Sequence, residues 1–364
     1  MTGAVARFLA STAVAAVLCG CGSVYNKASN VAWTPDTPVD KVSGADVMGE
    51  NSIVLAFSGG GLRAAAFTHG TLLALQGIRT PDGDLLDDVA IISSVSGSSL
   101  AAAYYGLNGR EGLGRFREEV LLPGFESGLR LSLLSPANLS RLMQGGLNVR
   151  EDFGDALDRK VFHGATFADL YRRPRPTIRI HATDLYHRVP FPFFPPVFAI
   201  MCSDITRYPV ADAVAASMAV PLVFAPIVVR TFPESCPPLP REIESLHILA
   251  ETSHSLQAID RALSTYRDGH VRYIKLADGG LTDNFGVSLL TAARIIYGTP
   301  YAPMTARDAV RLRRLLPSWP TPRAARAGTG STAKMAPPAS TWRSPRPTRR
   351  WIPRRGSPPT SSTT

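Results

Sequence analysis

A strand that runs into three consecutive glycines and then a helix sets the strongest limit on how this 364-residue chain folds. Residues 52–57 form an apolar run, which is typical of a strand buried on both faces. Gly59, Gly60 and Gly61 follow, and residues 62–75 have an Ala-rich composition that favours a helix. A strand, a tight turn and a helix in this order predict a repeating unit of an α/β fold.

The same alternation continues along the chain. Strand-like patterns occur at residues 88–92, 177–185 and 271–277, and helical patterns at residues 100–107 and 306–316. The sequence therefore predicts a three-layer α/β/α domain over residues 51–316, with a mainly parallel central sheet covered on both faces. Its glycine- and serine-rich turns follow the carboxyl ends of strands, which is the edge where ligand sites of such sheets lie.

The formal charge of +10 is confined to one end of the chain. Residues 317–364 hold nine of the 39 Lys and Arg residues and none of the 29 Asp and Glu residues. The first 316 residues therefore carry 30 basic and 29 acidic side chains, which gives no case for nucleic-acid binding.

The terminal segment, residues 317–364, also has ten prolines and no apolar periodicity, so we expect a disordered basic tail. Two explanations stay open. The tail is natural, or it results from a shifted reading frame, in which case the last strand or helix of the domain is missing and the product is unstable.

The N-terminus has the pattern of an export signal. Arg7 precedes the apolar residues 8–18, a run shorter than the roughly 20 residues that span a bilayer. Leu18 and Gly20 then stand at −3 and −1 before Cys21, which resembles the bacterial lipobox.

The lipobox resemblance implies removal of residues 1–20 and attachment of diacylglycerol to Cys21. The alternative is a plain signal peptide with a chance cysteine. Residues 21–50 are then a tether and lead-in. Because Gly22 is not acidic, we expect the outer membrane rather than the inner membrane of the cell envelope. No later segment is apolar and long enough to span a bilayer, so we expect anchoring without insertion.

Two cysteines remain beyond the predicted lipidation site. An exported compartment permits a disulfide between Cys202 and Cys236, and two buried free thiols are the alternative.

Three segments carry candidate chemistry, and the first is the glycine turn. Gly59, Gly60 and Gly61 before a helix expose backbone N–H groups, with Arg63 close by, and suit a phosphate cradle or an oxyanion hole. A phosphate loop needs a Lys-Ser/Thr pair or G-x-G-x-x-G spacing, and neither is present. A tight turn without function is the alternative.

The second segment is the serine cluster after residues 88–92. Ser96 occupies the middle position of a nucleophile elbow, with Ser94 and Ser98 in place of the outer glycines of G-x-S-x-G. Ser94 and Ser98 are alternative nucleophiles, and a serine-rich loop without catalysis also fits.

The third segment is Asp278, which two glycines follow. Its carboxylate can face a cleft, because the glycines do not cover it. Taken alone, this pattern is more typical of an aspartate that caps a turn. All seven histidines precede Asp278, which excludes the order Ser…Asp…His with Asp278 as the acid. A His-dependent site would need another pair, for example Asp184 or Asp212 with His254 or His270. We expect His69, inside the Ala-rich helix, to be structural.

Together these segments resemble the patatin-like phospholipases. The resemblance rests on a G-G-G-x-R turn at residues 59–63, Ser96 about 35 residues later, and the Asp-Gly-Gly motif at Asp278. An Ala-Ser-x-Ala-x-Pro block at residues 216–221 and Ala-Thr-Asp at residues 182–184 add to it.

The resemblance implies a lipid acyl hydrolase without metal or organic cofactor. Asp278 would accept the proton of Ser96, and the N–H groups of the turn, Gly59 to Gly61, would stabilise the oxyanion with help from Arg63. Membrane lipids or lysophospholipids are the implied substrates; head group, acyl position and oligomeric state stay open. The rivals are a non-catalytic lipid- or partner-binding lipoprotein of the same fold and a His-dependent α/β-hydrolase esterase.

Residues 189–200 contain four phenylalanines and four prolines. If this segment is an acyl-chain entry loop or a membrane-facing patch, the phenylalanine side chains are exposed. An edge hairpin with inward-packed aromatic rings is the reading we favour.

Overall fold

The computed structural model describes residues 27–37, 50–123, 150–239, 250–288 and 314–318, with the single positions 246, 292, 310 and 312. The chain divides into two compact units, 1–322 and 323–364, and every described residue belongs to the first. The predicted signal peptide, the lipidation site Cys21 and the terminal segment from residue 319 onward lie outside the described residues.

A seven-stranded mixed sheet forms the centre of the fold, in the order β11-β2-β5-β6-β10-β9, with β7 also paired to β6. Its strands are β2 (Asn51–Phe57), β5 (Val89–Val95), β6 (Thr177–Asp184), β7 (Val189–Phe193), β9 (Ile227–Arg230), β10 (Tyr273–Asp278) and β11 (Arg314–Ser318). Strands β11, β2, β5 and β6 run parallel, whereas β7 and β10 run antiparallel to β6, and β9 runs antiparallel to β10. Two further two-stranded pairs are β1 (Val31–Ala32) with β8 (Ser203–Asp204) and β3 (Arg79–Thr80) with β4 (Gly83–Asp84).

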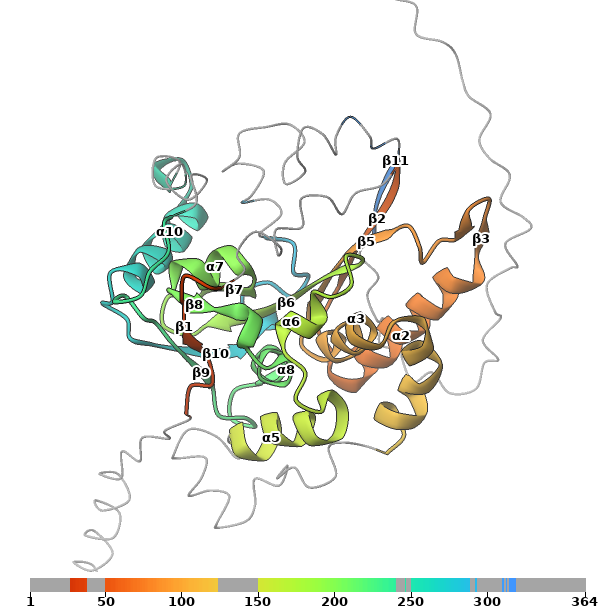
Figure 1. Ribbon diagram of the computed structural model, residues 1–364, viewed down its shortest axis with the longest axis horizontal. Helices are drawn as coiled ribbons and strands as arrows, with labels where there is room; N and C mark the ends of the chain where they lie inside the picture. Colours follow the sequence, from red (N-terminus) through yellow and green to blue (C-terminus); the bar gives the residue numbers. More distant parts are fainter. Residues whose placement is uncertain are drawn as a thin grey trace, which may run out of the picture. The chain divides into compact units, whose positions relative to one another are not determined.

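Helices flank the sheet in the predicted three-layer α/β/α arrangement (Figure 1). They are α2 (Gly61–Gly77), α3 (Gly97–Phe116), α5 (Arg150–Leu157), α6 (Phe167–Leu170), α7 (Pro195–Ile200), α8 (Val210–Met218) and α10 (His254–Arg267). Short π-helical segments cover Arg117–Leu121 and Asp158–Phe162, and 3-10 turns cover Ile205–Arg207, Ala250–Thr252 and Gly279–Leu281.

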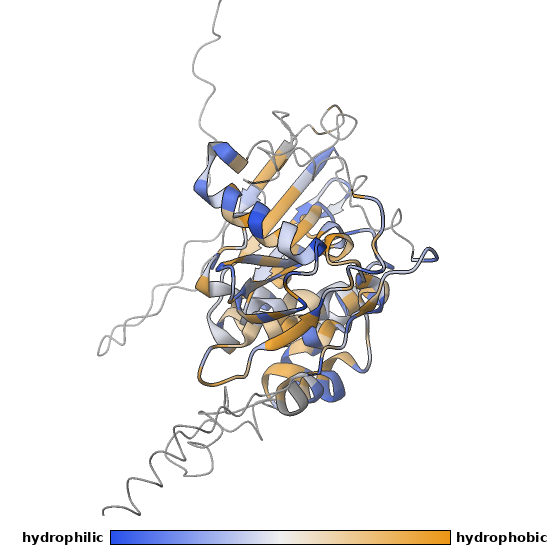
Figure 2. Cartoon of the chain, turned by 90° about the vertical axis from the view of Figure 1, so that its left-hand side faces the viewer, coloured by the Kyte–Doolittle hydropathy of each residue, from blue (hydrophilic) through white to orange (hydrophobic). Residues whose placement is uncertain are grey.

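Small residues let the central helices pack directly on the sheet, where apolar residues gather (Figure 2). Every residue of α8 is buried, because its Ala-rich sequence presents little volume on any side. In α3, a Cβ at Gly106 would lie 2.6 Å from side-chain atoms of Ile178 and Leu170, so only glycine fits there.

Part of the predicted tether is bound to the domain. Strand β1 pairs with β8, and the Asn30 side chain donates to Ser203 Oγ and to the Arg230 carbonyl while accepting from the Arg230 N–H. Composition alone did not reveal these contacts, because a short polar segment reads as a linker until its hydrogen-bond partners are known.

The predicted helix at residues 306–316 is wrong at its end. Residues Arg314–Ser318 form β11, the edge strand, which pairs in parallel with β2. Pro317, assigned to the tail, therefore belongs to the sheet. A strand with one neighbour tolerates a proline, because proline lacks only one backbone donor.

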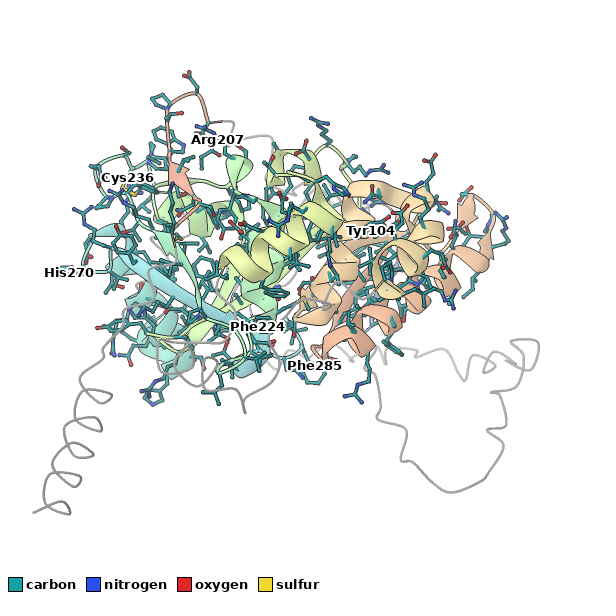
Figure 3. The ribbon with its side chains drawn as sticks, turned by 90° about the horizontal axis from the view of Figure 1, so that it is seen from below. Tyr104, Arg207, Phe224, Cys236, His270 and Phe285 are labelled. Atoms are coloured by element: carbon teal, nitrogen blue, oxygen red, sulfur yellow. A yellow bond between two sulfur atoms is a disulfide. The ribbon has the colours of Figure 1, made fainter. Side chains whose placement is uncertain are left out.

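The favoured reading of the aromatic segment is confirmed. Phe191 and Phe193 of β7 and Phe198 of α7 are buried, and β7 pairs along β6. Cys202 and Cys236 form a disulfide across 34 residues of sequence (Figure 3).

Candidate active site

Strands β5 and β10 meet end to end against one side of β6. Val95, the last residue of β5, pairs with His181, and Asp278, the last residue of β10, pairs with Ala182. Strand β7 pairs with residues 180–184 and thereby occupies the other side of β6, so β5 and β10 must share the remaining side. Two strands that approach from opposite directions therefore bring residues 96 and 278 together.

Ser96 stands on a strained turn between β5 and α3. Its φ of 56° and ψ of −132° lie in a region that serine rarely adopts, as expected for a nucleophile elbow. Ser217 holds the turn, because the Ser96 N–H donates to Ser217 Oγ at 2.8 Å. Gly97 leaves no space for a side chain, since a Cβ there would lie 1.9 Å from the Gly61 carbonyl oxygen.

The Ser96 hydroxyl donates to the Asp278 carboxylate, with 2.6 Å between Oγ and Oδ2. The second oxygen, Oδ1, accepts the Gly280 N–H at 2.8 Å, and the Asp278 N–H donates to the Ala219 carbonyl at 2.9 Å. Ser96 and Asp278 are 6% and 8% exposed. Burial raises the pKa of Asp278, whereas the hydrogen bonds from Ser96 and Gly280 oppose that rise. A raised pKa brings the carboxylate closer to the range in which a general base works at neutral pH.

The glycine turn lies against the serine. A Cβ at Gly59 would be 3.1 Å from the Ser96 Cβ, so the backbone of the turn lies close beside the nucleophile. Gly60 and Gly61 have φ values of 149° and 63°, which favour glycine. No hydrogen bond in the described part of the chain uses their N–H groups, and both residues are exposed at the N-terminus of α2. These are the requirements of an anion-stabilising turn.

Gly59 differs from its two neighbours. Its N–H is already donated to Asn284, at 3.1 Å to the side-chain Oδ1 and 3.3 Å to the carbonyl oxygen. It therefore ties the glycine turn to the loop after Asp278 instead of pointing a free donor at the serine. Arg63 is exposed on the first turn of α2, and no ion pair joins it to another described residue.

The two alternative nucleophiles have structural partners. Ser94 Oγ donates to the Arg179 carbonyl, and Ser98 Oγ donates its hydrogen to the Val95 carbonyl at 2.7 Å, with the Phe57 carbonyl 3.1 Å away. Both serines are completely buried. Ser96 is therefore the serine of this cluster that meets a carboxylate.

No histidine side chain in the described part of the chain hydrogen-bonds to Ser96 or Asp278. His69 Nε2 contacts the Leu113 carbonyl at 2.7 Å, the structural role that we predicted. His254 is exposed, and His270, at the margin of the domain in Figure 3, pairs with Asp268. His187 binds the buried Asp184. No histidine within the described ranges hydrogen-bonds to Ser96, and His247 lies outside them.

Several residues of the site were not assigned a role from the sequence. Ser217 joins the elbow to β6, because its hydroxyl accepts from the Ser96 N–H and donates to the His181 carbonyl. Asn284 binds the glycine turn. The Ala-Ser-x-Ala-x-Pro block was the available signal for Ser217, whereas nothing in the local pattern distinguished Asn284.

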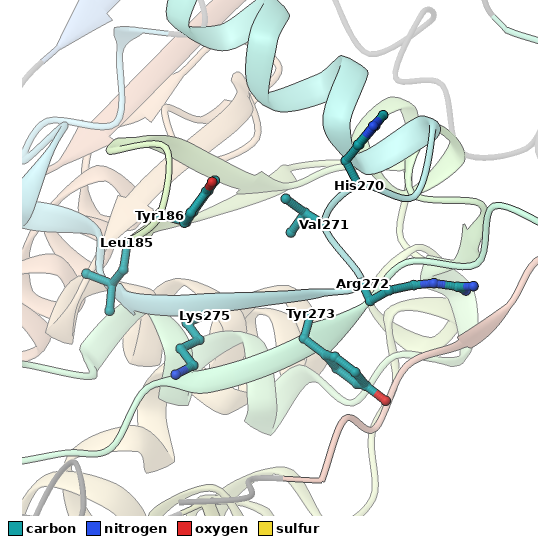
Figure 4. Close-up of a pocket in the computed structure, with 7 residues that line it drawn as sticks. All are labelled: Leu185, Tyr186, His270, Val271, Arg272, Tyr273 and Lys275. Carbon is teal, nitrogen blue, oxygen red and sulfur yellow. The ribbon is translucent and has the colours of Figure 1, made fainter. Parts of the chain in front are cut away.

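A pocket of about 510 Å³ lies near the beginning of β10, at the opposite end of that strand from Asp278. Figure 4 shows its lining, which contains Tyr186, Arg272, Tyr273 and Lys275. None of these residues belongs to the Ser96–Asp278 network. Within the described ranges, no helix is both long and apolar enough to cross a membrane.

The chain matches a known protein-family model. The model of the family described as patatin-like phospholipase matches residues 55–291, well over half of the chain. The match includes the glycine turn, Ser96 and Asp278. A search of curated proteins found no match.

Proposed function

The chain belongs to the patatin-like phospholipase family, and because this membership supports lipid acyl hydrolysis, we propose that Ser96 and Asp278 form the catalytic dyad of the chain. The observation that carries the proposal is the 2.6 Å hydrogen bond from Ser96 Oγ to Asp278 Oδ2. The strained elbow supports it, as do the N–H groups of Gly60 and Gly61, which donate to no acceptor among the described residues.

In the proposed reaction, Ser96 Oγ attacks the ester carbonyl carbon while its proton passes to Asp278. The carbonyl oxygen becomes an oxyanion, which accepts hydrogen bonds from Gly60 and Gly61. Loss of one such donor costs on the order of 3 kcal/mol in the barrier. Asp278 then returns the proton to the leaving alkoxide, and an acyl ester remains on Ser96.

The second half of the reaction consumes water. Asp278 takes a proton from the water molecule, whose oxygen attacks the acyl carbon. Collapse of the second oxyanion breaks the bond to Ser96 Oγ, which recovers the proton, and a free fatty acid leaves. We propose membrane phospholipids or lysophospholipids as the substrates.

We also propose that the protein is exported and anchored through Cys21 to the cell envelope, with the outer membrane favoured. The Cys202–Cys236 disulfide supports this proposal, because disulfides persist in oxidising compartments. Replacement of Cys21 by serine should abolish incorporation of labelled fatty acid and release the protein from the membrane fraction. A Cys19→Ser variant is the matched control and should stay anchored. Equal labelling of the Cys21→Ser variant would exclude Cys21 as the acceptor.

The dyad is tested with Ser96→Ala and Asp278→Asn. Both variants should fold and both should lose hydrolysis of a p-nitrophenyl ester, and a fluorophosphonate probe should label wild type but not Ser96→Ala. Matched controls are Ser264→Ala and Asp268→Asn, which lie on or next to the exposed side of α10. Full activity in either dyad variant would refute the mechanism, and absence of labelling in wild type would favour a non-catalytic lipid-binding protein.

A further inference from the structure

The side chain of His181 has a definite protonation state. Ser93 Oγ donates its only hydrogen to the Gly286 carbonyl at 2.7 Å. His181 Nε2 lies 2.8 Å from Ser93 Oγ. Because the Ser93 hydrogen is already donated to Gly286, Nε2 must carry the hydrogen of this second bond and donate it to Ser93 Oγ. The other ring nitrogen, Nδ1, is buried and has no hydrogen-bond partner within the described part of the chain. A neutral ring with its hydrogen on Nε2 satisfies this arrangement.

The His181–Ser93 pair fixes the loop that follows the catalytic aspartate. A Cβ at Gly286 would lie 2.6 Å from Ser93 Oγ and 3.1 Å from His181 Cδ2, so the loop backbone rests directly on the pair. The other end of the loop is fixed at Asp278, whose N–H donates to the Ala219 carbonyl. The loop is therefore held at both ends.

Asn284 extends this support to the glycine turn. It lies two residues before Gly286 and accepts the Gly59 N–H. A shift of Gly286 would move Asn284 and, through Gly59, the adjacent N–H groups of Gly60 and Gly61. The position of the proposed oxyanion donors thus depends on the hydrogen bond between His181 and Ser93.

We propose that His181 is a positioning residue that uses its Nε2–H, through Ser93 and Gly286, to hold the Asp278 loop and the glycine turn in register. This inference rests on the proposed function of Ser96 and Asp278. His181 does not act as a base in it, because its free nitrogen is buried and no bond joins the ring to Ser96.

Charged neighbours do not alter that state. Asp283 in the supported loop favours the protonated ring, and Arg179 on the same strand disfavours it. Burial outweighs both and lowers the pKa of His181 to about 4. The ring is neutral at the pH at which an ester hydrolase would be assayed.

The position of the donor provides the test. Glutamine can present an N–H near the place of Nε2, whereas asparagine presents one only near the place of Nδ1. We expect His181→Gln to keep kcat within about threefold of wild type. His181→Asn and Ser93→Ala should lower kcat by about 100-fold with KM little changed, as expected when catalytic groups are misplaced by an ångström or so.

The controls separate positioning from stability. His69 is also buried with Nε2 on a partner, so His69→Asn should lower the melting temperature without changing the kcat of the folded fraction. Adding Ser93→Ala to His181→Asn should cause little further loss, because both changes break the same link. Equal kcat values for His181→Gln and His181→Asn, measured on folded protein, would overturn the inference. Failure of the proposed dyad would give a different result: the fluorophosphonate probe would not label wild type, and Ser96→Ala would keep its activity.

Discussion

Acid should destabilise this protein through His181. The ring is buried and uncharged in the folded chain, so its pKa falls from 6.5 to about 4. Between these two values the unfolded chain binds a proton that the folded chain does not. The free energy of unfolding must therefore decrease as the pH is lowered through this window.

The size of the effect follows from the shift. A difference of about 2.5 pKa units corresponds to roughly 3 kcal/mol once the pH is below both values. At pH 5 about 2 kcal/mol of it is already lost relative to pH 7, which is a large part of the stability of an ordinary domain. Burial raises the pKa of Asp278 above its usual value, so protonation of this carboxyl stabilises the folded chain as the pH falls and opposes the effect of His181; wild type alone therefore does not isolate the histidine.

Urea unfolding of wild type and His181→Gln at pH 7, 6 and 5 isolates the contribution of His181. Glutamine does not titrate, so every other group cancels in the difference between the two proteins. The advantage of wild type should shrink by about 2 kcal/mol from pH 7 to pH 5. A difference that stays constant over this range would mean that the ring is accessible to water or already charged, and would refute the reasoning.

Two other changes test the packing around the site and the disulfide. Gly97→Ala brings a Cβ to 1.9 Å from the Gly61 carbonyl oxygen. We expect the free energy of unfolding in urea to fall by about 1–3 kcal/mol and kcat to fall strongly. The control Gly70→Ala has open space around its Cβ and should not lower the free energy of unfolding. Wild-type kinetics in Gly97→Ala would contradict the close contact. Cys236→Ser opens the loop to Cys202 and should lower the free energy of unfolding by about 4 kcal/mol; an unchanged urea midpoint would show that the bond is absent in solution.

Local sequence pattern was sufficient to predict which secondary-structure elements flank the candidate site residues. Ser96 and the glycine turn each follow an apolar strand and precede a helix, and that order alone predicts that both lie at strand-to-helix turns. The same reasoning predicted the strand before Asp278. These predictions succeed because each depends on neighbours only a few residues away.

Contacts between distant segments could not be predicted in this way. The pairing of Ser96 with Asp278 requires that β5 and β10 lie on one side of β6, which no single segment specifies. Asn284 meets Gly59 across 225 residues of sequence. Strand β11 was misread for a different reason, since a short Leu-rich segment fits a helix as well as an edge strand until its partner β2 is known.

The end-to-end approach of β5 and β10 has a consequence for tolerance to insertions. The separation of nucleophile and carboxylate is set by one peptide unit of β6, between His181 and Ala182. An extra residue at that point would push the two strand ends apart by about 3.3 Å and break the hydrogen bond. The lengths of the connections between helices and strands in the stretches from Ser96 to β6 and from β6 to Asp278 do not enter this distance, so we expect the reacting groups to stay in contact when such a connection is lengthened or shortened.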